Sequence, residues 1–496
     1  MTLLLLLPIL GLTWAVASAA RPALRGLVGW KALAFLLLSE VVLMPAFWLA
    51  ILVLFVRRRG TDRLRVVALA LALTCGGYAV ALTVRCFFLE AFHIPTGSMM
   101  PTLMGAPFGD PAGGDRILVD KSAYVRGPVR RWDVAVFRYP LDRSRSFVKR
   151  VVGLAGEEVL LKLGDVYSRI DPNGPFTLAR KPHDVQESVW APIAPSAAFT
   201  TWVFTPPEAA RTEGEGTVVD ASGSVVPVFC RYPYRITDRV GGTSGGPPED
   251  VFDLRLRVCL SLDRLAEVKL RIIGVSGTAE LAFAPGGDGS VTWTSPSSEV
   301  STRVDSPNLH LDGAPHVVSL ATYDGVVEAA IDAGAPVEVL GRSEFNPQAA
   351  SRASNVEIEV SGGKATFAGV GLHRDLYYLD GGPGSALCPE GTALRVPDHA
   401  FFFLGDNSPN AKDGRLWRRK VFRMRDGRVI RADTSNVHLE GDAFVVRDEW
   451  GIERVLPRSE LTGPPQSEAC PFVDEDLLRG RLWCIWWPFD RARRFP

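Results

Sequence analysis

Ser98 is the first residue whose surroundings in the sequence suggest covalent chemistry. It stands in the stretch HIPTGSMMP, residues 93–101, where two prolines and a glycine predict an extended segment followed by a tight turn. A serine on such a turn is open to substrate. A seryl hydroxyl attacks an amide only with a base within hydrogen-bond reach and with donors for the developing oxyanion. The chain must therefore supply a base from another segment.

Lys149 is the candidate for that base. It lies in the run SFVKRVVGLAGE, residues 146–157, whose β-branched residues predict a strand. Burial disfavours the ammonium form and lowers the pKa of a lysine toward the range of a general base. The alternative interpretation is a solvated lysine at a sheet edge, which is the commoner role of a strand lysine.

A third stretch, FFFLGDNSPNAKDGR at residues 401–415, begins as an apolar strand and ends in a polar turn. The turn is followed by Asp413 and Arg415, two positions apart. Taken alone, this pattern indicates an Asx-type turn and nothing more.

In combination, the three stretches resemble the bacterial type I signal peptidases, the membrane-bound Ser/Lys proteases that remove signal peptides from exported proteins. The resemblance also covers GDRILV at residues 114–119 and RWDVAVF at residues 131–137, in the family's order. GRLWCIWWPF at residues 480–489 is similar to the family's C-terminal tail, more loosely.

The resemblance implies a role for each matching residue. Ser98 would be the nucleophile and Lys149 the general base, and the Ser98 amide and Thr96 hydroxyl would form the oxyanion hole. Shallow pockets for small P1 and P3 side chains would be lined by Phe92, Ile94, Pro95 and Val148. A supporting network near the base would be formed by Asp406, Asn407, Ser408, Asp413 and Arg415. No cofactor is expected, and no metal, because the histidines lack metal-ligand spacing.

The chain departs from the family pattern at three positions. Ala411 and Gly414 stand where the family commonly has serines, so Lys149 loses hydrogen-bond partners, and Ser408 is a candidate substitute. Trp132 replaces the usual glycine of an Arg-Gly-Asp stretch, a change that we expect to be tolerated.

Three apolar runs, at residues 3–20, 32–56 and 66–84, each approach the ~20 residues that a membrane-spanning helix needs. The arginine-rich loop between the second and third runs predicts a cytoplasmic loop, which places the rest of the chain outside. The first run could instead be a cleaved signal peptide, although no basic residue precedes it. We therefore expect a multi-pass protein of the bacterial cytoplasmic membrane with its catalytic domain on the extracytoplasmic side.

The sequence predicts a mainly β fold behind the membrane anchor. Short alternating runs at residues 252–258, 268–272, 316–320, 326–331 and 356–360 indicate strands of an antiparallel sandwich, loosely similar to concanavalin-like or laminin-G-like domains. The expected organisation is an anchor at residues 1–86 and a first catalytic β segment at residues 87–168. An insertion at residues 169–395 follows, with its sandwich at about 236–378, and a second catalytic segment with the tail occupies residues 396–496.

The chain carries 55 basic and 55 acidic residues, so its zero formal charge argues against a nucleic-acid binder. The expected partners are exported preproteins, the lipid bilayer and the secretion machinery. The leading hypothesis is signal-peptide cleavage by a Ser98/Lys149 dyad. One alternative is a catalytically impaired relative whose β insert binds a ligand at the membrane surface, and another is an active protease that the insert restricts to few substrates.

Overall fold

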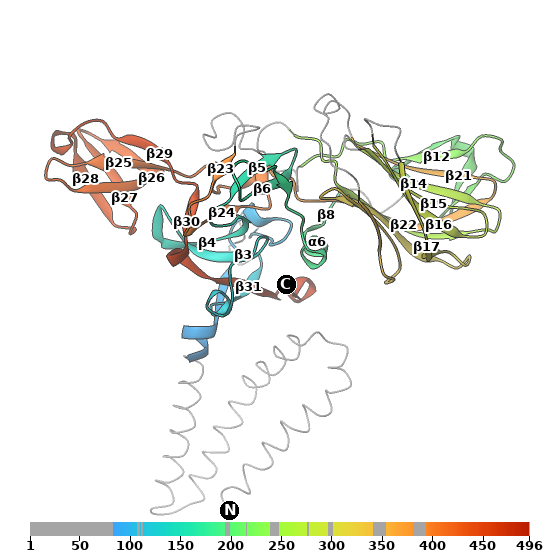
Figure 1. Ribbon diagram of the computed structural model, residues 1–496, viewed down its shortest axis with the longest axis horizontal. Helices are drawn as coiled ribbons and strands as arrows, with labels where there is room; N and C mark the ends of the chain where they lie inside the picture. The colour runs from blue at the N-terminus through green and yellow to red at the C-terminus, as the bar shows by residue number, and fades with distance from the viewer. Residues whose placement is uncertain are drawn as a thin grey trace, which may run out of the picture. The chain divides into compact units, whose positions relative to one another are not determined.

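The computed structural model is mainly β (Figure 1). It describes residues 83–106, 110, 113–193, 199–214, 216–238, 248–274, 277–295, 301–340, 354–379 and 393–495. The three predicted membrane spans lie outside these residues, apart from residues 83 and 84. Within the described ranges, no helix combines the length and apolar character needed to cross a bilayer. The chain divides into unit 1, residues 1–93, 115–128 and 480–495, and unit 2, which contains residues 94–114 and 129–479.

In unit 1, β1 pairs with β2, β2 with β31 and β31 with β32, all in the antiparallel direction. Its elements are η1 (Val84–Phe88), β1 (Leu89–His93), β2 (Arg116–Asp120), α5 (Ala123–Arg126), β31 (Leu478–Trp487), η9 (Phe489–Arg491) and β32 (Arg493–Arg494). Phe92 is half-buried on β1, opposite Ile117 of β2.

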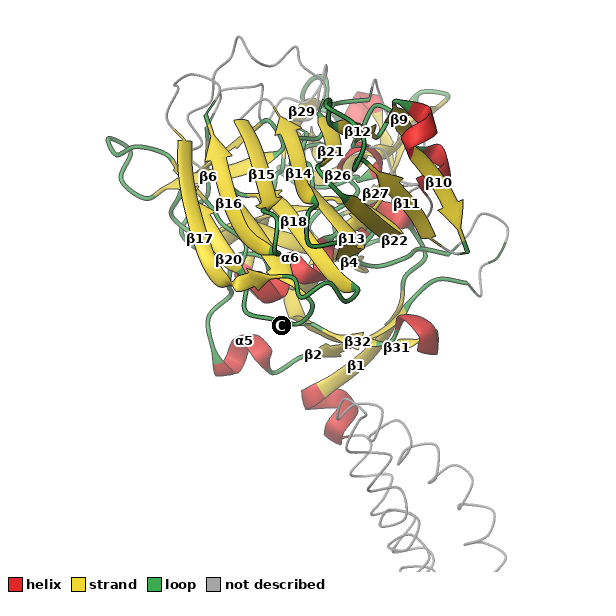
Figure 2. Cartoon of the chain, turned by 90° about the vertical axis from the view of Figure 1, so that its right-hand side faces the viewer, coloured by secondary structure: helices red, strands yellow, loops and turns green. Residues whose placement is uncertain are grey.

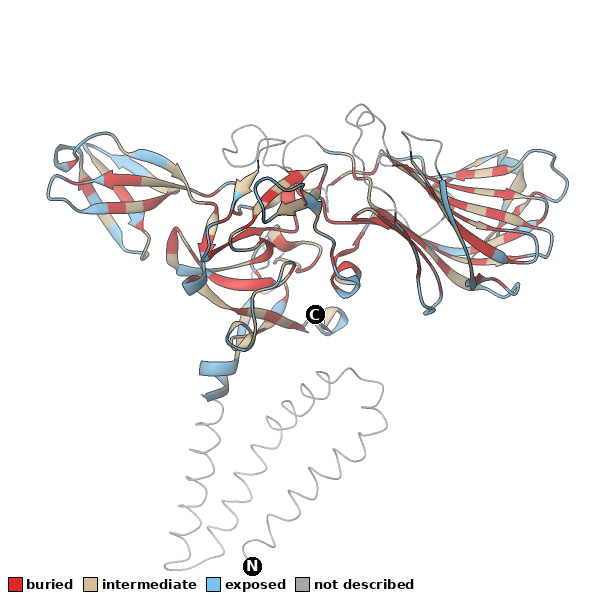
Figure 3. Cartoon of the chain, viewed as in Figure 1, coloured by how far each residue is buried: buried red, intermediate tan, exposed pale blue. Residues whose placement is uncertain are grey.

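In unit 2 an antiparallel sheet carries the lysine and the strand that ends in the polar turn. Its strands are β3 (Val134–Tyr139), β4 (Asp142–Gly153), β24 (Ala400–Leu404) and β30 (Phe472–Asp474). β4 pairs with β3 on one side and β24 on the other, which buries its second half. All five residues of β24 are buried, because both faces of this strand are covered (Figure 3). The uninterrupted apolar run in the sequence is typical of such a strand.

A second, four-stranded sheet packs against the first through a shared core that includes Val152, Val159 and Phe402. Its strands, in spatial order, are β23 (Leu394–Arg395), β5 (Glu158–Lys162), β6 (Asp165–Arg169) and β7 (Thr177–Leu178). Helix α6 (His183–Val189) contributes Val185 and Val189 to the same core.

The long segment that follows α6 forms two large antiparallel sheets, which we call the two-sheet region. The first has the order β10 (Ala210–Glu213), β11 (Gly216–Asp220), β22 (Lys364–Arg374), β13 (Leu254–Leu262), β18 (His316–Tyr323), β19 (Val326–Ile331) and β20 (Val337–Leu340), with β8 (Ala191–Pro192) beside β22. The second has the order β17 (Ser301–His310), β16 (Asp288–Thr294), β15 (Gly277–Phe283), β14 (Glu267–Gly274), β21 (Asn355–Ser361), β12 (Val228–Arg231) and β9 (Val203–Thr205), and Figure 2 shows β17 to β14 side by side.

One hydrophobic core is shared by both large sheets, with Leu256 of β13 and Leu270 of β14 among its members. The alternating runs of the sequence fall on these strands, since every second residue faces this core. The run predicted at residues 252–258 differs only at its start, because β13 begins two residues later, at Leu254.

A separate five-stranded sheet with a core of its own follows β24 in the sequence. Its spatial order is β28 (Glu453–Pro457), β27 (Ala443–Asp448), β26 (Val429–Glu440), β25 (Arg418–Arg423) and β29 (Gln466–Ala469). Short 3₁₀ helices connect the strands of unit 2, and two of them, η2 (Gly97–Met99) and η6 (Ser408–Asn410), lie at the site described next.

Candidate active site

Ser98 and Lys149 come together from two separate elements of unit 2. Ser98 lies in η2 and Lys149 on β4. The Lys149 Nζ atom lies 2.6 Å from the Ser98 Oγ atom, and Lys149 is only 3 % exposed. A nucleophile and its base need a separation of about 2.6 to 3.2 Å. The arrangement therefore permits direct proton transfer between hydroxyl and amine.

Burial lowers the pKa of Lys149 to about 8. The nearby Asp413 and Asp406 carboxylates oppose this shift, and the Arg415 guanidinium supports it. Desolvation is the largest effect because the buried ammonium loses its hydration. A substantial fraction of the amine is then neutral near pH 7 to 8 and can accept a proton.

The start of η2 displays a backbone amide beside the hydroxyl. Ser98 is the second residue of this helix, and the first amides of a helix lack an intrahelical acceptor. The Thr96 Oγ1 atom lies 3.5 Å from Ser98 Oγ, and Thr96 is exposed. These two groups are suitable donors for an oxyanion that forms next to Ser98.

The turn after β24, residues 405–407, fixes the serine loop. The Asn407 side-chain Nδ2 donates to the Gly97 carbonyl at 2.9 Å, and the Asn407 amide donates to the Ser98 carbonyl at 3.2 Å. A Cβ atom at Gly405 would lie 2.6 Å from the Ser98 carbonyl oxygen and 2.5 Å from the Ala411 Cβ. Only glycine allows this close approach of the two backbones.

Two buried ion pairs support the turn. Arg150 binds Asp406 with two hydrogen bonds, of 2.8 and 2.7 Å, and Thr102 Oγ1 donates to the same carboxylate at 2.5 Å. Arg415 binds Asp413 in the same bidentate way, at 2.8 and 2.6 Å. The sequence analysis did not identify Arg150 and Thr102 as members of this network. Arg150 could have been found, because it directly follows Lys149 and a charged residue on a buried strand needs an oppositely charged partner.

Residues 65–179, which include Ser98 and Lys149, match the model of the family described as Signal peptidase, peptidase S26. This part of the chain is therefore similar to the signal peptidase S26 family. Signal peptidase I of Pseudomonas aeruginosa is 44 % identical over 92 residues, which are 16 % of this chain and 30 % of that protein. Signal peptidase I of Buchnera aphidicola subsp. Acyrthosiphon pisum is 36 % identical over 102 residues, 18 % of this chain and 30 % of that protein. For the enzyme of Leptolyngbya laminosa the identity is 38 % over 95 residues, 18 % of this chain and 42 % of that protein. The chain thus spans less than half the length of each of these relatives.

Solved structures similar to the chain include a laminarinase catalytic domain from Thermotoga maritima, with a TM-score of 0.28 and 14 % identity. The match covers 38 % of this chain and 99 % of that domain. A β-1,3-glucanase from Mycobacterium marinum has a TM-score of 0.25 and 12 % identity, over 37 % of this chain and 92 % of that protein. Such low scores support no statement about what any part of the chain does.

The positions at which this chain departs from the signal peptidase pattern have structural consequences. Ala411 is buried, and a side chain at Gly414 would place its Cβ 2.5 Å from the Pro471 carbonyl oxygen. The Ser408 hydroxyl accepts hydrogen bonds from the Leu379 amide at 2.8 Å and from Arg415 at 2.5 Å, so it serves the ion pair. Among the residues that the structure describes, Ser98 is the hydrogen-bond partner of the Lys149 amine.

Trp132 has a φ of 75°, a conformation that favours glycine. This backbone conformation explains why glycine is the usual residue at the position of Trp132. The strain is offset by packing, because Trp132 is buried and its Nε1 donates to the Arg180 carbonyl at 3.0 Å. Its own carbonyl accepts from Arg150 at 2.8 Å.

The residues predicted to line the P1 and P3 pockets are distributed over both units. Ile94 is buried, Pro95 is exposed and Val148 is half-buried on β4, one position before Lys149. These three lie in unit 2, whereas Phe92 lies in unit 1.

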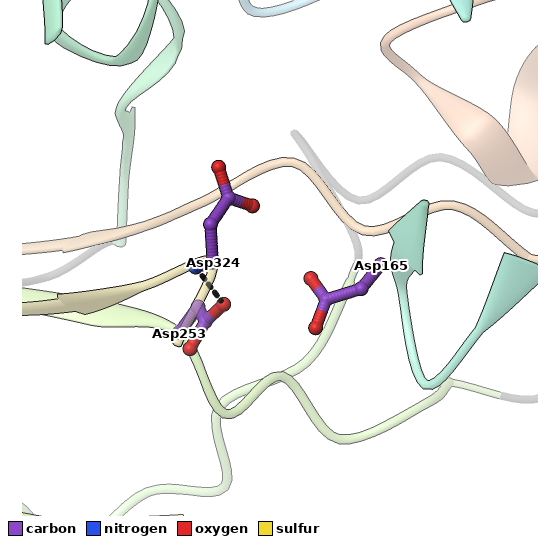
Figure 4. A group of neighbouring side chains, drawn as sticks. All are labelled: Asp165, Asp253 and Asp324. Atoms are coloured by element: carbon purple, nitrogen blue, oxygen red, sulfur yellow. Dashed lines mark hydrogen bonds between the residues drawn. The ribbon is translucent and has the colours of Figure 1, made fainter. Parts of the chain in front are cut away.

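A second group of titratable side chains joins β6 to the two-sheet region. One carboxylate oxygen from each of Asp165, Asp253 and Asp324 lies within 4.8 Å of the other two, and Figure 4 shows the Asp324 backbone amide donating to the Asp253 carboxylate. The Lys181 ammonium lies 2.6 Å from Asp324 and 2.9 Å from Asp375, and so supplies a cation beside the cluster. Burial, together with the neighbouring carboxylates, raises the pKa of Asp253 to about 7.

We predict that Asp253→Asn stabilises the chain at pH 8. The raised pKa means that the folded state favours the neutral acid, so its stability contribution is present below about pH 4 and is lost as pH rises through about 7. A permanently neutral amide should raise the free energy of unfolding at pH 8 by on the order of 2 kcal/mol and change it little at pH 4. Urea denaturation at both pH values measures this, with the exposed Asp305→Asn as the matched control. A loss of stability at pH 8 would contradict the prediction.

Proposed function

We propose that this chain is a membrane-bound serine endopeptidase that removes N-terminal signal peptides from exported preproteins with a Ser98/Lys149 dyad. The observation that carries the proposal is the 2.6 Å hydrogen bond between the buried Lys149 amine and the Ser98 hydroxyl. The similarity of residues 65–179 to the signal peptidase S26 family supports the choice of reaction.

In the proposed reaction the neutral Lys149 amine takes the hydroxyl proton while Ser98 Oγ attacks the carbonyl carbon of the scissile bond. The negative charge that develops on the carbonyl oxygen is stabilised by the Ser98 amide and the Thr96 hydroxyl. The Lys149 ammonium then protonates the leaving amine, and an ester to Ser98 remains. Water hydrolyses this ester with Lys149 again acting as the base.

Ile94, Pro95 and Val148, all in unit 2, are proposed to form shallow pockets that admit small side chains at P1 and P3. Larger side chains would be excluded by steric contact. One extra methylene changes binding by only ~1 to 3 kcal/mol, so several contacts must act together to reject bulk.

The proposal includes the predicted location and organisation. The apolar runs before residue 85 would anchor the chain in the cytoplasmic membrane, with the Ser98/Lys149 pair on the extracytoplasmic side and contacts to the bilayer and the secretion machinery. The two-sheet region would be a sandwich of the concanavalin-like or laminin-G-like type, inserted between two halves of the catalytic domain. Its shared core and antiparallel order support this interpretation.

A second candidate function is ligand binding at the membrane surface by a catalytically impaired relative. The observation that favours it is Ala411, which leaves Lys149 without a hydroxyl that the family commonly provides. This alternative expects no processing of any preprotein by the wild-type chain.

The test is cleavage of a preprotein by the full chain in detergent or in proteoliposomes. Ser98→Ala and Lys149→Ala should each abolish cleavage, whereas Ser146→Ala, an exposed residue on the same strand as Lys149, should retain it. Undiminished cleavage by either dyad variant would eliminate the assignment. An inactive wild-type chain would favour the alternative.

A further inference from the structure

The segment that leaves the two-sheet region after β22 runs directly into the network behind Ser98 and Lys149. The Tyr378 amide donates to the Gly164 carbonyl at 3.0 Å, in an antiparallel bridge. Gly164 has a φ of +90°, and a Cβ there would lie 2.3 Å from the Tyr377 ring. The Tyr377 ring packs directly against Gly164, and this contact fixes the position of the segment after β22 beside β6.

Two residues of this segment contact the network. The Tyr378 hydroxyl donates to Asp406 Oδ1 at 3.2 Å, and Tyr378 is 3 % exposed. Burial, followed by the Asp406 charge, raises the pKa of Tyr378 well above its usual value, so the hydroxyl stays a donor. Leu379 donates from its amide to Ser408, and its carbonyl accepts from Arg415 at 2.9 Å.

Asp406 connects these contacts to both members of the dyad. It precedes Asn407, whose amide and side chain hold the Ser98 loop. Its negative charge also opposes the lowering of the Lys149 pKa by burial. A donor on Asp406 disperses that charge and so favours the neutral amine.

We propose that Tyr378, in the segment that follows β22, is a positioning residue for the Ser98–Lys149 pair and acts through Asp406. The inference rests on the proposed function. It makes the segment after β22 a part of the site, because Tyr378 packs in the same core as Val152 and Phe402.

The test is Tyr378→Phe in the full chain. Loss of the hydroxyl leaves the Asp406 charge less dispersed, so the Lys149 pKa should rise by about half a unit, which is about threefold less neutral amine at pH 7. The value of kcat/KM should therefore fall about threefold at pH 7 and recover near pH 10. Tyr323→Phe is the matched control, because Tyr323 donates to the Glu328 carboxylate at 2.8 Å within the two-sheet region.

A second readout does not require activity. The chain contains nine lysines, so the Lys149 signal in a ¹³Cε-lysine NMR titration can be assigned with Lys149→Met. Its midpoint should move up in Tyr378→Phe and stay unchanged in Tyr323→Phe. Thr102→Val removes another donor to Asp406 and should shift the midpoint in the same direction.

An unchanged Lys149 midpoint in Tyr378→Phe would overturn the inference, as would a loss of rate that is the same at every pH. A wild-type chain without Ser98-dependent cleavage would count against the proposed function. The NMR titration would still decide the role of Tyr378.

Discussion

Lys149→Met is expected to lower kcat/KM for preprotein cleavage by about 10³-fold or more at pH 8, because general-base assistance of this kind contributes about 10² to 10⁴-fold. Methionine has a similar length and apolar character, so it fills the same buried space on β4. The variant should therefore lose the base without losing the fold.

The same variant should be as stable as the wild type or more stable at pH 7. Burial lowers the pKa of Lys149 to about 8, below its ordinary value, so the folded state binds fewer protons than the unfolded state between about pH 8 and 10.5. Stability therefore rises with pH across that window, and below it the buried ammonium costs about 3 kcal/mol.

Urea denaturation at pH 7 and preprotein cleavage at pH 8 measure the two effects. Lys162→Met on β5 is the control, since Lys162 is only half-buried. Residual cleavage within tenfold of the wild type, by a folded Lys149→Met variant, would contradict a role of this amine as the base.

Arg150→Met is expected to cause the largest loss of stability among the substitutions considered. Arg150 and Asp406 are both almost fully buried, with side-chain exposures of 2 % and 0 %. Removing one partner of a buried pair leaves an uncompensated charge, and we expect the free energy of unfolding to fall by about 3 to 5 kcal/mol. Cleavage should fall as well, since Asp406 precedes the residue that holds the Ser98 loop.

The double variant Arg150→Met with Asp406→Asn should recover much of this stability, because no buried charge then remains unpaired. Arg211→Met is the matched control, since Arg211 and Glu213 form an exposed pair on β10 whose loss should change stability by less than about 1 kcal/mol. The measurement is the urea denaturation midpoint of the wild type, Arg150→Met, the double variant and Arg211→Met. Equal losses for Arg150→Met and Arg211→Met would show that the buried pair has no special role.

The sequence was informative wherever chemistry depends on local pattern. The turn around Ser98, the β-branched run around Lys149 and the all-apolar run before Gly405 each follow from residue types at short spacing. The alternating runs predicted strands of the two-sheet region because one face of each strand meets a shared core.

What the sequence could not provide are contacts between residues far apart in the chain. Thr102 and Tyr378 both donate a hydrogen bond to the Asp406 carboxylate, although they lie 304 and 28 residues from it in the sequence. No pattern in the residues around Thr102 or Tyr378 predicts these contacts. The 2.6 Å separation of Ser98 and Lys149 likewise depends on how η2 lies against β4.

The most direct test of the account is the pH dependence of kcat/KM for preprotein cleavage by the wild-type chain. This profile reports the ionisation of the essential base in the free enzyme. We predict a rate that rises tenfold per pH unit, bends at an apparent pKa of about 8 and is flat above it, because only the neutral Lys149 amine accepts the Ser98 proton. A rate that is already flat at pH 6, or that bends only near the ordinary lysine pKa of about 10.4, would contradict it.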